Sequence, residues 1–269
     1  MTDWRESLER IRSKEIDIAF DGYGEKAFAN ALELGAGSGF QSQLLIRYAG
    51  RLVATELNVE RLGTAPHEGV EYVVCDAERV GESFPPHSFD LVFSSNVFEH
   101  LPSPATALAG VRAVLAEDGV VVLIMPNSLW KLFSLLGFYP NACRLLMRAF
   151  REGRLQMLWD RYVSRAPGVD DRALKRKGNN LKEVSRRSDR SGVFYPEPHG
   201  AYPTHMAEFA AFSKRNWERK FVDAGFDVVV VKKGPISSGY GFGFERIKRL
   251  IERLGLTTEY IYILRERRF

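Results

Sequence analysis

The segment LELGAGSG, residues 32–39, decides the fold that we predict for this chain. It places a glycine at every second position from Gly35 to Gly39, directly after the apolar stretch Ala29 to Leu34. Glycine has no Cβ, so the backbone can turn sharply there and a ligand can approach it closely. A helical pattern over 41–48 follows, and this order of strand, glycine turn and helix is typical of nucleotide-binding βα units. A plain glycine turn without a ligand is the alternative interpretation.

The spacing of these glycines separates two classes of nucleotide site. A dinucleotide fingerprint has the form G-x-G-x-x-G, which would need a glycine at position 40, where the chain has Phe40. The observed form is G-x-G-x-G. An NAD-dependent oxidoreductase or epimerase therefore stays as an alternative that the sequence disfavours. The chain also lacks the G-x-x-x-x-G-K-[ST] motif, so a P-loop is not indicated.

Strand and helix patterns alternate on both sides of the glycine segment. Such alternation predicts a parallel sheet that is covered by helices on both faces. The apolar runs and their spacing predict strands over 29–34, 52–56, 70–75, 89–94, 119–125, 228–231 and 260–264, and helices over 5–20, 41–48, 104–115, 206–224 and 244–254.

Two acidic residues stand at the ends of the second and third predicted strands. Glu56 ends the second strand, and Asp76 follows the third. The carboxylate of Glu56, at the end of the second strand, can accept hydrogen bonds from ribose hydroxyls. The alternatives are an exposed acid for Glu56 and a helix N-cap for Asp76, because aspartate is common at N-caps.

These segments resemble, in order, the motifs of class I S-adenosylmethionine (SAM) dependent methyltransferases. LELGAGSG is similar to the family's first motif, E/D-x-G-x-G-x-G, and Glu56 and Asp76-Ala77 stand where the family has its next acidic positions. FDLVFSSNVFEHL, residues 89–101, resembles the fourth motif. The resemblance covers residues 29–127 and 206–265, with little to match in 128–200.

The resemblance implies both a fold and an activity. The fold is a mostly parallel, seven-stranded, doubly wound α/β sheet of the Rossmann-like type. Residues 1–127 and 201–269 form its core, and 128–200 form a helical or irregular insertion after the fifth strand. The activity is methyl transfer from SAM to oxygen or nitrogen. Glu-His-Leu at 99–101 is typical of a branch with small-molecule, glycan or lipid-linked acceptors. The residues predicted to contact SAM are Glu33, Gly35, Ala36, Gly37, Gly39, Glu56, Leu57, Asp76, Ala77, Ser95 and Asn96.

Two histidines are candidate general bases for an acceptor that must lose a proton. His100 follows the fourth strand on the expected cofactor side, with a structural role in its loop as the alternative. His199 lies between Pro198 and Gly200, in a loop that could close over the pocket. His205 is expected to help begin the following helix. No cluster of cysteines or histidines predicts a metal site.

The predicted insertion carries the clues to the acceptor. Its first part, 128–160, is aromatic and leucine-rich, and residues 148–190 hold 13 Lys and Arg against 6 Asp and Glu, while the whole chain has a net charge of only +4. A lid over the site, a solvated lobe, a peripheral contact with anionic lipids through 128–160 and a path for RNA all stay open. An RNA methyltransferase is disfavoured because no RNP-like motif is present.

Sequence features also predict a location. The chain has two isolated cysteines, a charged N-terminus and no apolar run long enough to cross a bilayer. We therefore expect a cytoplasmic protein. The insertion suggests a peripheral position at the inner face of the membrane as an alternative.

Overall fold

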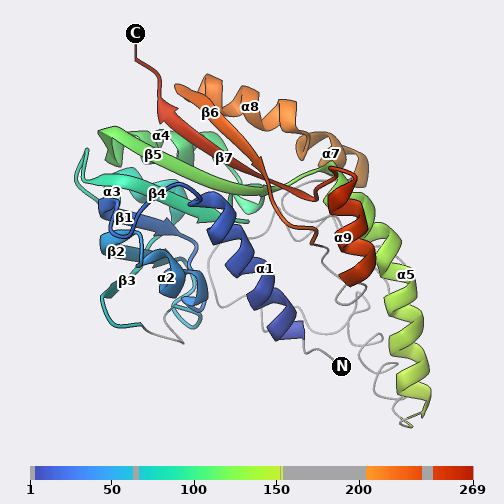
Figure 1. Cartoon of the computed structure of the whole chain (residues 1–269). Helices are drawn as coiled ribbons and strands as arrows, with labels where there is room; N and C mark the ends of the chain where they lie inside the picture. Colours follow the sequence, from blue (N-terminus) through green and yellow to red (C-terminus); the bar gives the residue numbers. More distant parts are fainter. Residues whose placement is uncertain (1–3, 63–66, 152, 154–203, 238–244, 269) are drawn as a thin grey trace, which may run out of the picture.

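The computed structural model describes residues 4–62, 67–151, 153, 204–237 and 245–268, and is drawn in Figure 1. Its centre is a seven-stranded sheet in the order β3-β2-β1-β4-β5-β7-β6. The strands are β1 Phe28–Leu34, β2 Ala49–Glu56, β3 Val70–Val74, β4 Phe89–Ser95, β5 Leu115–Pro126, β6 Phe226–Lys233 and β7 Glu259–Glu266. The helices are α1 Trp4–Ala19, α2 Phe40–Leu45, α3 Val80–Ser83, α4 Pro104–Val114, α5 Ser128–Arg151, α7 His205–Ala211, α8 Lys214–Asp223 and α9 Glu245–Arg253, with short 3-10 turns η1 Ala77–Arg79 and η2 Phe98–His100.

The strand directions confirm the predicted fold class. Strands β1 to β5 pair in parallel, whereas β7 runs antiparallel between β5 and β6. The carboxyl ends of the five parallel strands therefore lie along one edge of the sheet, which is the edge where open α/β sheets bind their ligands.

Side chains on the central strands alternate between two buried layers. In β4, Leu91 and Phe93 pack with Ile16 of α1 and with Phe20, which directly follows that helix, whereas Val92 packs on the opposite face with α4 and α8. A strand sends successive side chains to opposite faces, so a sheet covered on both faces needs apolar residues at every position. This requirement explains why the central strands are continuous apolar runs.

The helix predicted over 206–224 is wrong in one respect, because the structure has two helices there. Helix α7 ends at Ala211, and α8 begins after Ser213, whose side-chain oxygen accepts a hydrogen bond from the backbone N–H of Asn216. The Asn216 side chain donates back to the carbonyl of Ala211 at 2.8 Å. A serine that caps a new helix competes with continuation of the old one.

Helix α5 begins directly after β5, where the predicted insertion starts. The side-chain oxygen of Asn127 accepts hydrogen bonds from the N–H groups of Leu129 and Trp130, which starts the helix. A buried ion pair of 2.6 Å between Lys131 and Glu208 joins α5 to α7. Beyond Arg151 and Gly153, the rest of the predicted insertion lies outside the described residues. No helix within the described ranges is both long and apolar enough to cross a membrane.

Candidate functional site

One cavity of about 1190 Å³ opens at the carboxyl edge of the parallel strands. The ends of four neighbouring strands, β3, β2, β1 and β4, contribute to its wall, and α1 contributes Leu8, Glu9 and Arg12. Residues predicted from the sequence that line this cavity are Gly35, Ala36, Gly37, Glu56, Leu57, Asp76, Ala77, Ser95, Asn96 and His100. Their roles as cofactor contacts or base stay predictions, but the fold brings all ten to one place.

The glycine loop has the backbone that its sequence predicts. Gly35, Gly37 and Gly39 have φ values of 77°, 56° and 92°, in the left-handed region that favours glycine. A Cβ placed on Gly35 would lie 2.3 Å from the Val97 side chain, so that position has no room for one. A Cβ on Gly37 would meet no protein atom within 4 Å. Gly37 therefore borders open space in the cavity wall, where a ligand can approach the backbone.

Glu56 ties the glycine loop to the neighbouring strand. One of its carboxylate oxygens accepts a hydrogen bond of 3.0 Å from the N–H of Gly37, and the other accepts one of 3.0 Å from the N–H of Asn58. Each carboxylate oxygen can accept two hydrogen bonds, so this arrangement leaves acceptor capacity for ligand hydroxyls.

Asp76 is a helix N-cap that also lines the cavity. It is the N-cap of η1, with one side-chain oxygen accepting a hydrogen bond of 2.9 Å from the N–H of Glu78. It also lines the cavity together with Ala77. The helix cap thus fixes the carboxylate beside the space that a ligand would occupy.

Two predicted contacts lie outside the cavity wall. Gly39 is the N-cap of α2. Glu33 is buried, and its carboxyl accepts a hydrogen bond of 2.5 Å from the Ser42 hydroxyl. Burial raises the pKa of Glu33 to about 7. Glu33 therefore connects β1 to α2 from inside the protein, and its side chain does not face the cavity.

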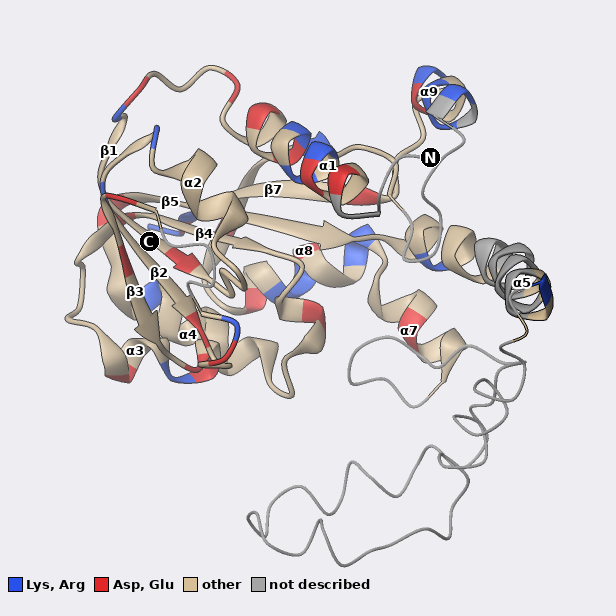
Figure 2. Cartoon of the chain, turned by 90° about the horizontal axis from the view of Figure 1, so that it is seen from below, with Lys and Arg blue, Asp and Glu red and all other residues tan. Residues whose placement is uncertain are grey.

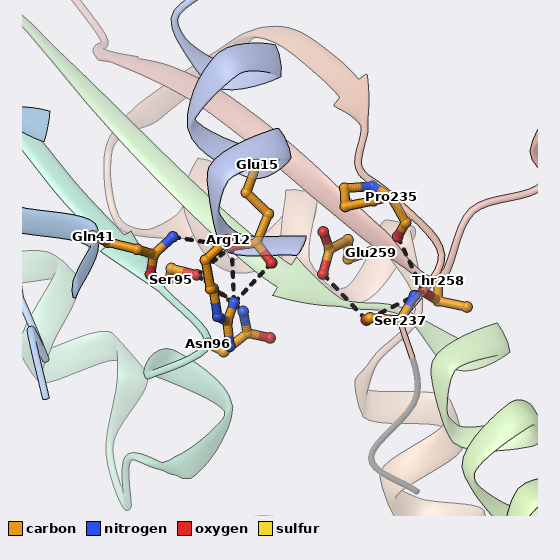
Figure 3. A network of polar contacts seen from close by, with 9 residues as sticks. All are labelled: Arg12, Glu15, Gln41, Ser95, Asn96, Pro235, Ser237, Thr258 and Glu259. Atoms are coloured by element: carbon orange, nitrogen blue, oxygen red, sulfur yellow. Dashed lines mark hydrogen bonds and ion pairs between the residues drawn. The ribbon is translucent and has the colours of Figure 1, made fainter. Parts of the chain in front are cut away.

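Ser95 and Asn96, at the end of β4, are held in place by α1. The sequence did not predict that this helix contributes to the site. As Figure 3 shows, Arg12 and Glu15 of α1 reach the Ser95 hydroxyl, at 2.9 Å and 3.0 Å. Figure 2 shows acidic and basic residues intermingled along α1, so these two look like ordinary surface charges in the sequence. Only their burial against β4 distinguishes them.

His100 lines the cavity at the same end. Its side chain is 44% exposed, and its Nε2 lies 3.8 Å from a carboxyl oxygen of Glu99, which is buried. Partial burial lowers the pKa of His100, which keeps the imidazole neutral near pH 7. Burial also raises the pKa of Glu99 to about 8. The other candidate base, His199, lies outside the described residues, and His205 is the first residue of α7, as expected.

The cavity suits SAM chemically. Carboxylates at Glu56 and Asp76 can accept hydrogen bonds from ribose and adenine donors, Leu57 and Ala77 offer apolar surface to a base, and the space at Gly37 admits a ligand against the backbone. In the described ranges, no three His, Cys, Asp or Glu side chains are grouped closely enough to hold a metal ion.

Comparison with known proteins finds similarity to methyltransferases. Residues 32–123 match the family described as "Methyltransferase domain". A ubiquinone biosynthesis O-methyltransferase of Burkholderia ambifaria is 27% identical over 175 residues, which are 62% of this chain and 75% of that protein. The same enzyme of Burkholderia vietnamiensis is 28% identical over 125 residues, or 44% of this chain and 53% of that protein. A highly reducing polyketide synthase of Pyrenophora dematioidea is 28% identical over 128 residues, or 41% of this chain, but the match spans only 5% of the synthase.

Solved structures share the fold over nearly all of the chain. A SAM-dependent methyltransferase from Archaeoglobus fulgidus superimposes with a TM-score of 0.54 and 16% sequence identity, covering 97% of this chain and 99% of that one. At this level of identity the likeness concerns the fold alone.

Proposed function

Because residues 32–123 of this chain are a methyltransferase domain of the class I, SAM-dependent family, we propose that it transfers the methyl group of SAM to an oxygen or nitrogen atom of a small-molecule acceptor. The observation that carries the proposal is the single cavity shared by the Gly35–Gly37 turn, Glu56 and Asp76. Acidic side chains beside a glycine turn suit a nucleoside without phosphates better than a nucleotide.

Each part of the cavity wall has its own role in this proposal. Glu56 binds the ribose hydroxyls, Asp76 and Ala77 with Leu57 hold the adenine, and the glycine turn supports the methionine portion. When bound, SAM supplies an electrophilic methyl group on a sulfonium sulfur. The main contribution of the protein is to hold donor and acceptor at attack distance, which can lower the barrier by about 7–11 kcal/mol.

His100 is the proposed general base for a hydroxyl or ammonium acceptor. It lines the cavity, and its lowered pKa keeps it able to accept a proton at neutral pH. General-base help of this kind typically accelerates a reaction by about 10²–10⁴-fold. His199 stays a second predicted base.

The proposal extends to the class of acceptor. The relatives named for ubiquinone biosynthesis are O-methyltransferases, which favours a hydroxyl on a small molecule. Exposed Met147 and Phe150 on α5, 61% and 73% exposed, are compatible with a lipid-linked acceptor and peripheral membrane contact through 128–160. Sedimentation with anionic liposomes tests that extension, and protein that stays in the supernatant contradicts it.

Mass spectrometry of cell extract incubated with the protein and methyl-labelled SAM tests the central proposal. We expect label in a small molecule, and the labelled product identifies the acceptor atom. Label in RNA instead would favour the RNA methyltransferase alternative. Folded protein that yields no labelled product would contradict the proposal.

A further inference from the structure

Hydrogen-bond polarity at the end of β4 fixes the orientation of one amide that faces the cavity. The Ser95 hydroxyl has three partners, namely Arg12 Nη1 at 2.9 Å, Glu15 Oε2 at 3.0 Å and Asn96 Nδ2 at 3.0 Å. Arginine only donates, and a carboxylate only accepts. The single hydroxyl proton of Ser95 must therefore be donated to Glu15. The hydroxyl oxygen must accept the hydrogen bonds from Arg12 and Asn96.

This polarity turns the Asn96 amide in one direction. Because Ser95 has no second proton to give, Asn96 has to present its NH₂ group to Ser95, and its Oδ1 points away from Ser95. Asn96 lines the cavity, and Oδ1 accepts no hydrogen bond from any residue in the described ranges. The cavity wall thus contains an oriented acceptor oxygen that has no partner among the residues that the structure describes.

The supports of this amide are rigid. Glu15 is fully buried and also accepts two 2.8 Å hydrogen bonds from Arg12 and one of 3.1 Å from Gln41. The Asn96 backbone has a φ of 55°, a left-handed conformation that is uncommon for residues other than glycine, and its N–H donates to the carbonyl of Ile124.

The sheet order places this oxygen away from the proposed nucleoside end of the cavity. Glu56 ends β2 and Asp76 lies just after β3, whereas Asn96 follows β4, two and three strands further along. Strands lie about 4.8 Å apart, so these ends are separated by about 10–14 Å. A nucleoside bound at Glu56 leaves the β4 end to the reacting groups, where His100 also lies.

We propose that Asn96 Oδ1 accepts a hydrogen bond from the O–H or N–H group of the acceptor that receives the methyl, and that Ser95 and Glu15 are positioning residues for this amide. The proposal rests on the proposed function. It gives the acceptor one required feature, a hydrogen-bond donor on the attacking atom. It also replaces the cofactor contact predicted for the Asn96 side chain.

Three variants test it. Asn96→Gly suits the φ of 55° and removes the amide. Ser95→Ala removes the hydroxyl that sets the amide's direction, and Ser95→Thr is the matched control that keeps a hydroxyl. For each we would measure the dissociation constants of S-adenosylhomocysteine and of 5′-methylthioadenosine, which lacks the amino-acid group, and the rate of labelled product formation from cell extract.

We expect Asn96→Gly and Ser95→Ala to lower the turnover rate about tenfold with saturating extract, the usual effect of one lost hydrogen bond. Ser95→Thr should restore most of the rate, and the two dissociation constants should stay within twofold of wild type. Weaker binding of S-adenosylhomocysteine, with 5′-methylthioadenosine unaffected, would assign Asn96 to the cofactor and overturn the proposal. Unchanged turnover in both loss variants would overturn it while leaving the methyltransferase function intact. A wild type that binds S-adenosylhomocysteine but forms no product would overturn both.

Discussion

Gly37 is the residue whose missing side chain matters most to the proposed cofactor site. Because a Cβ at this position would meet only the open cavity, Gly37→Val should fill the space where the ligand approaches the backbone. We expect calorimetry to show no binding of S-adenosylhomocysteine at high micromolar concentration.

Gly22→Val is the matched control for this variant. Gly22 also has a positive φ, 95°, and open space around it, but it does not line the cavity. Both variants therefore carry a similar backbone strain, and only one obstructs the site. Equal affinity in the two folded variants would show that the glycine turn is not the cofactor site.

Glu33 makes the stability of the fold depend on pH. Its pKa of about 7 in the folded protein lies above the usual 4.5, so the folded state keeps a proton that the unfolded state has lost. Its contribution to the free energy of unfolding is therefore complete below pH 4.5 and decreases until about pH 7, by about 3 kcal/mol. Glu33→Gln cannot ionise, so relative to wild type it should gain this amount between pH 4.5 and pH 8. Urea unfolding at both pH values measures the difference, and parallel behaviour of the two proteins would contradict it.

If His100 is the general base, its protonation should set how kcat/KM falls at low pH. A base must be neutral to accept a proton, and burial lowers the pKa of His100 below 6.5. We expect kcat/KM to be flat near pH 7 and to fall as the pH decreases through that pKa. His100→Gln should lower the rate about 10²-fold and remove this limb. A variant that retains both the rate and the limb would exclude His100 as the base.

At the scale of elements, the buried ion pair between Lys131 and Glu208 connects α5 to α7. Both side chains are almost fully buried, at 4% and 0% exposure. Lys131→Met removes the cation and leaves the Glu208 carboxylate inside the protein without its lysine. We expect a loss of about 3–5 kcal/mol in the free energy of unfolding, measured with urea.

The double variant Lys131→Met, Glu208→Leu distinguishes charge burial from packing. Replacing both partners of a buried ion pair with apolar residues is often neutral or stabilising. Recovery of most of the lost stability is therefore expected. A double variant as unstable as Lys131→Met alone would mean that the instability comes from lost packing and not from the unpaired buried carboxylate.

The elements that the sequence predicted well are those with a local signal. Apolar runs located every strand of the sheet, and Gly225 and Gly255, at φ of 87° and 77°, follow α8 and α9 as helix stops do. The break at Ser213 was missed because a serine inside an amphipathic pattern can either face solvent or cap a new helix. Only the Asn216 contacts reveal which occurs.

In the candidate site, too, the residues with a local sequence signal could be predicted and the others could not. Residues next to the strand ends, such as Glu56 and Asp76, could be placed from the sequence because topology brings strand ends together. Arg12 and Glu15 could not, because their connection with Ser95 spans 83 and 80 residues. Buried Glu259, from β7 near the opposite end of the chain, likewise interacts with Arg12 and Glu15.

At the scale of the whole molecule, ligand binding should be visible as stability. A ligand that binds only the folded state at 100 times its dissociation constant adds about 2.7 kcal/mol. For a chain of this length that corresponds to roughly 5–10 °C in Tm. We expect this rise with S-adenosylhomocysteine and none with NADH. The reverse result would favour the oxidoreductase alternative.

All residues that line the described cavity, from Leu8 to Pro102, precede β5 in the chain. Helix α5 lies after it and begins the stretch in which the sequence places its acceptor clues, and α7 follows that stretch. The chain before β5 and the chain after it therefore form two modules. Descendants could exchange the part after β5 and acquire new acceptors while keeping the same methyl donor. Chimaeras joined at Pro126 would test whether exchanging the later part changes the acceptor while SAM binding is kept.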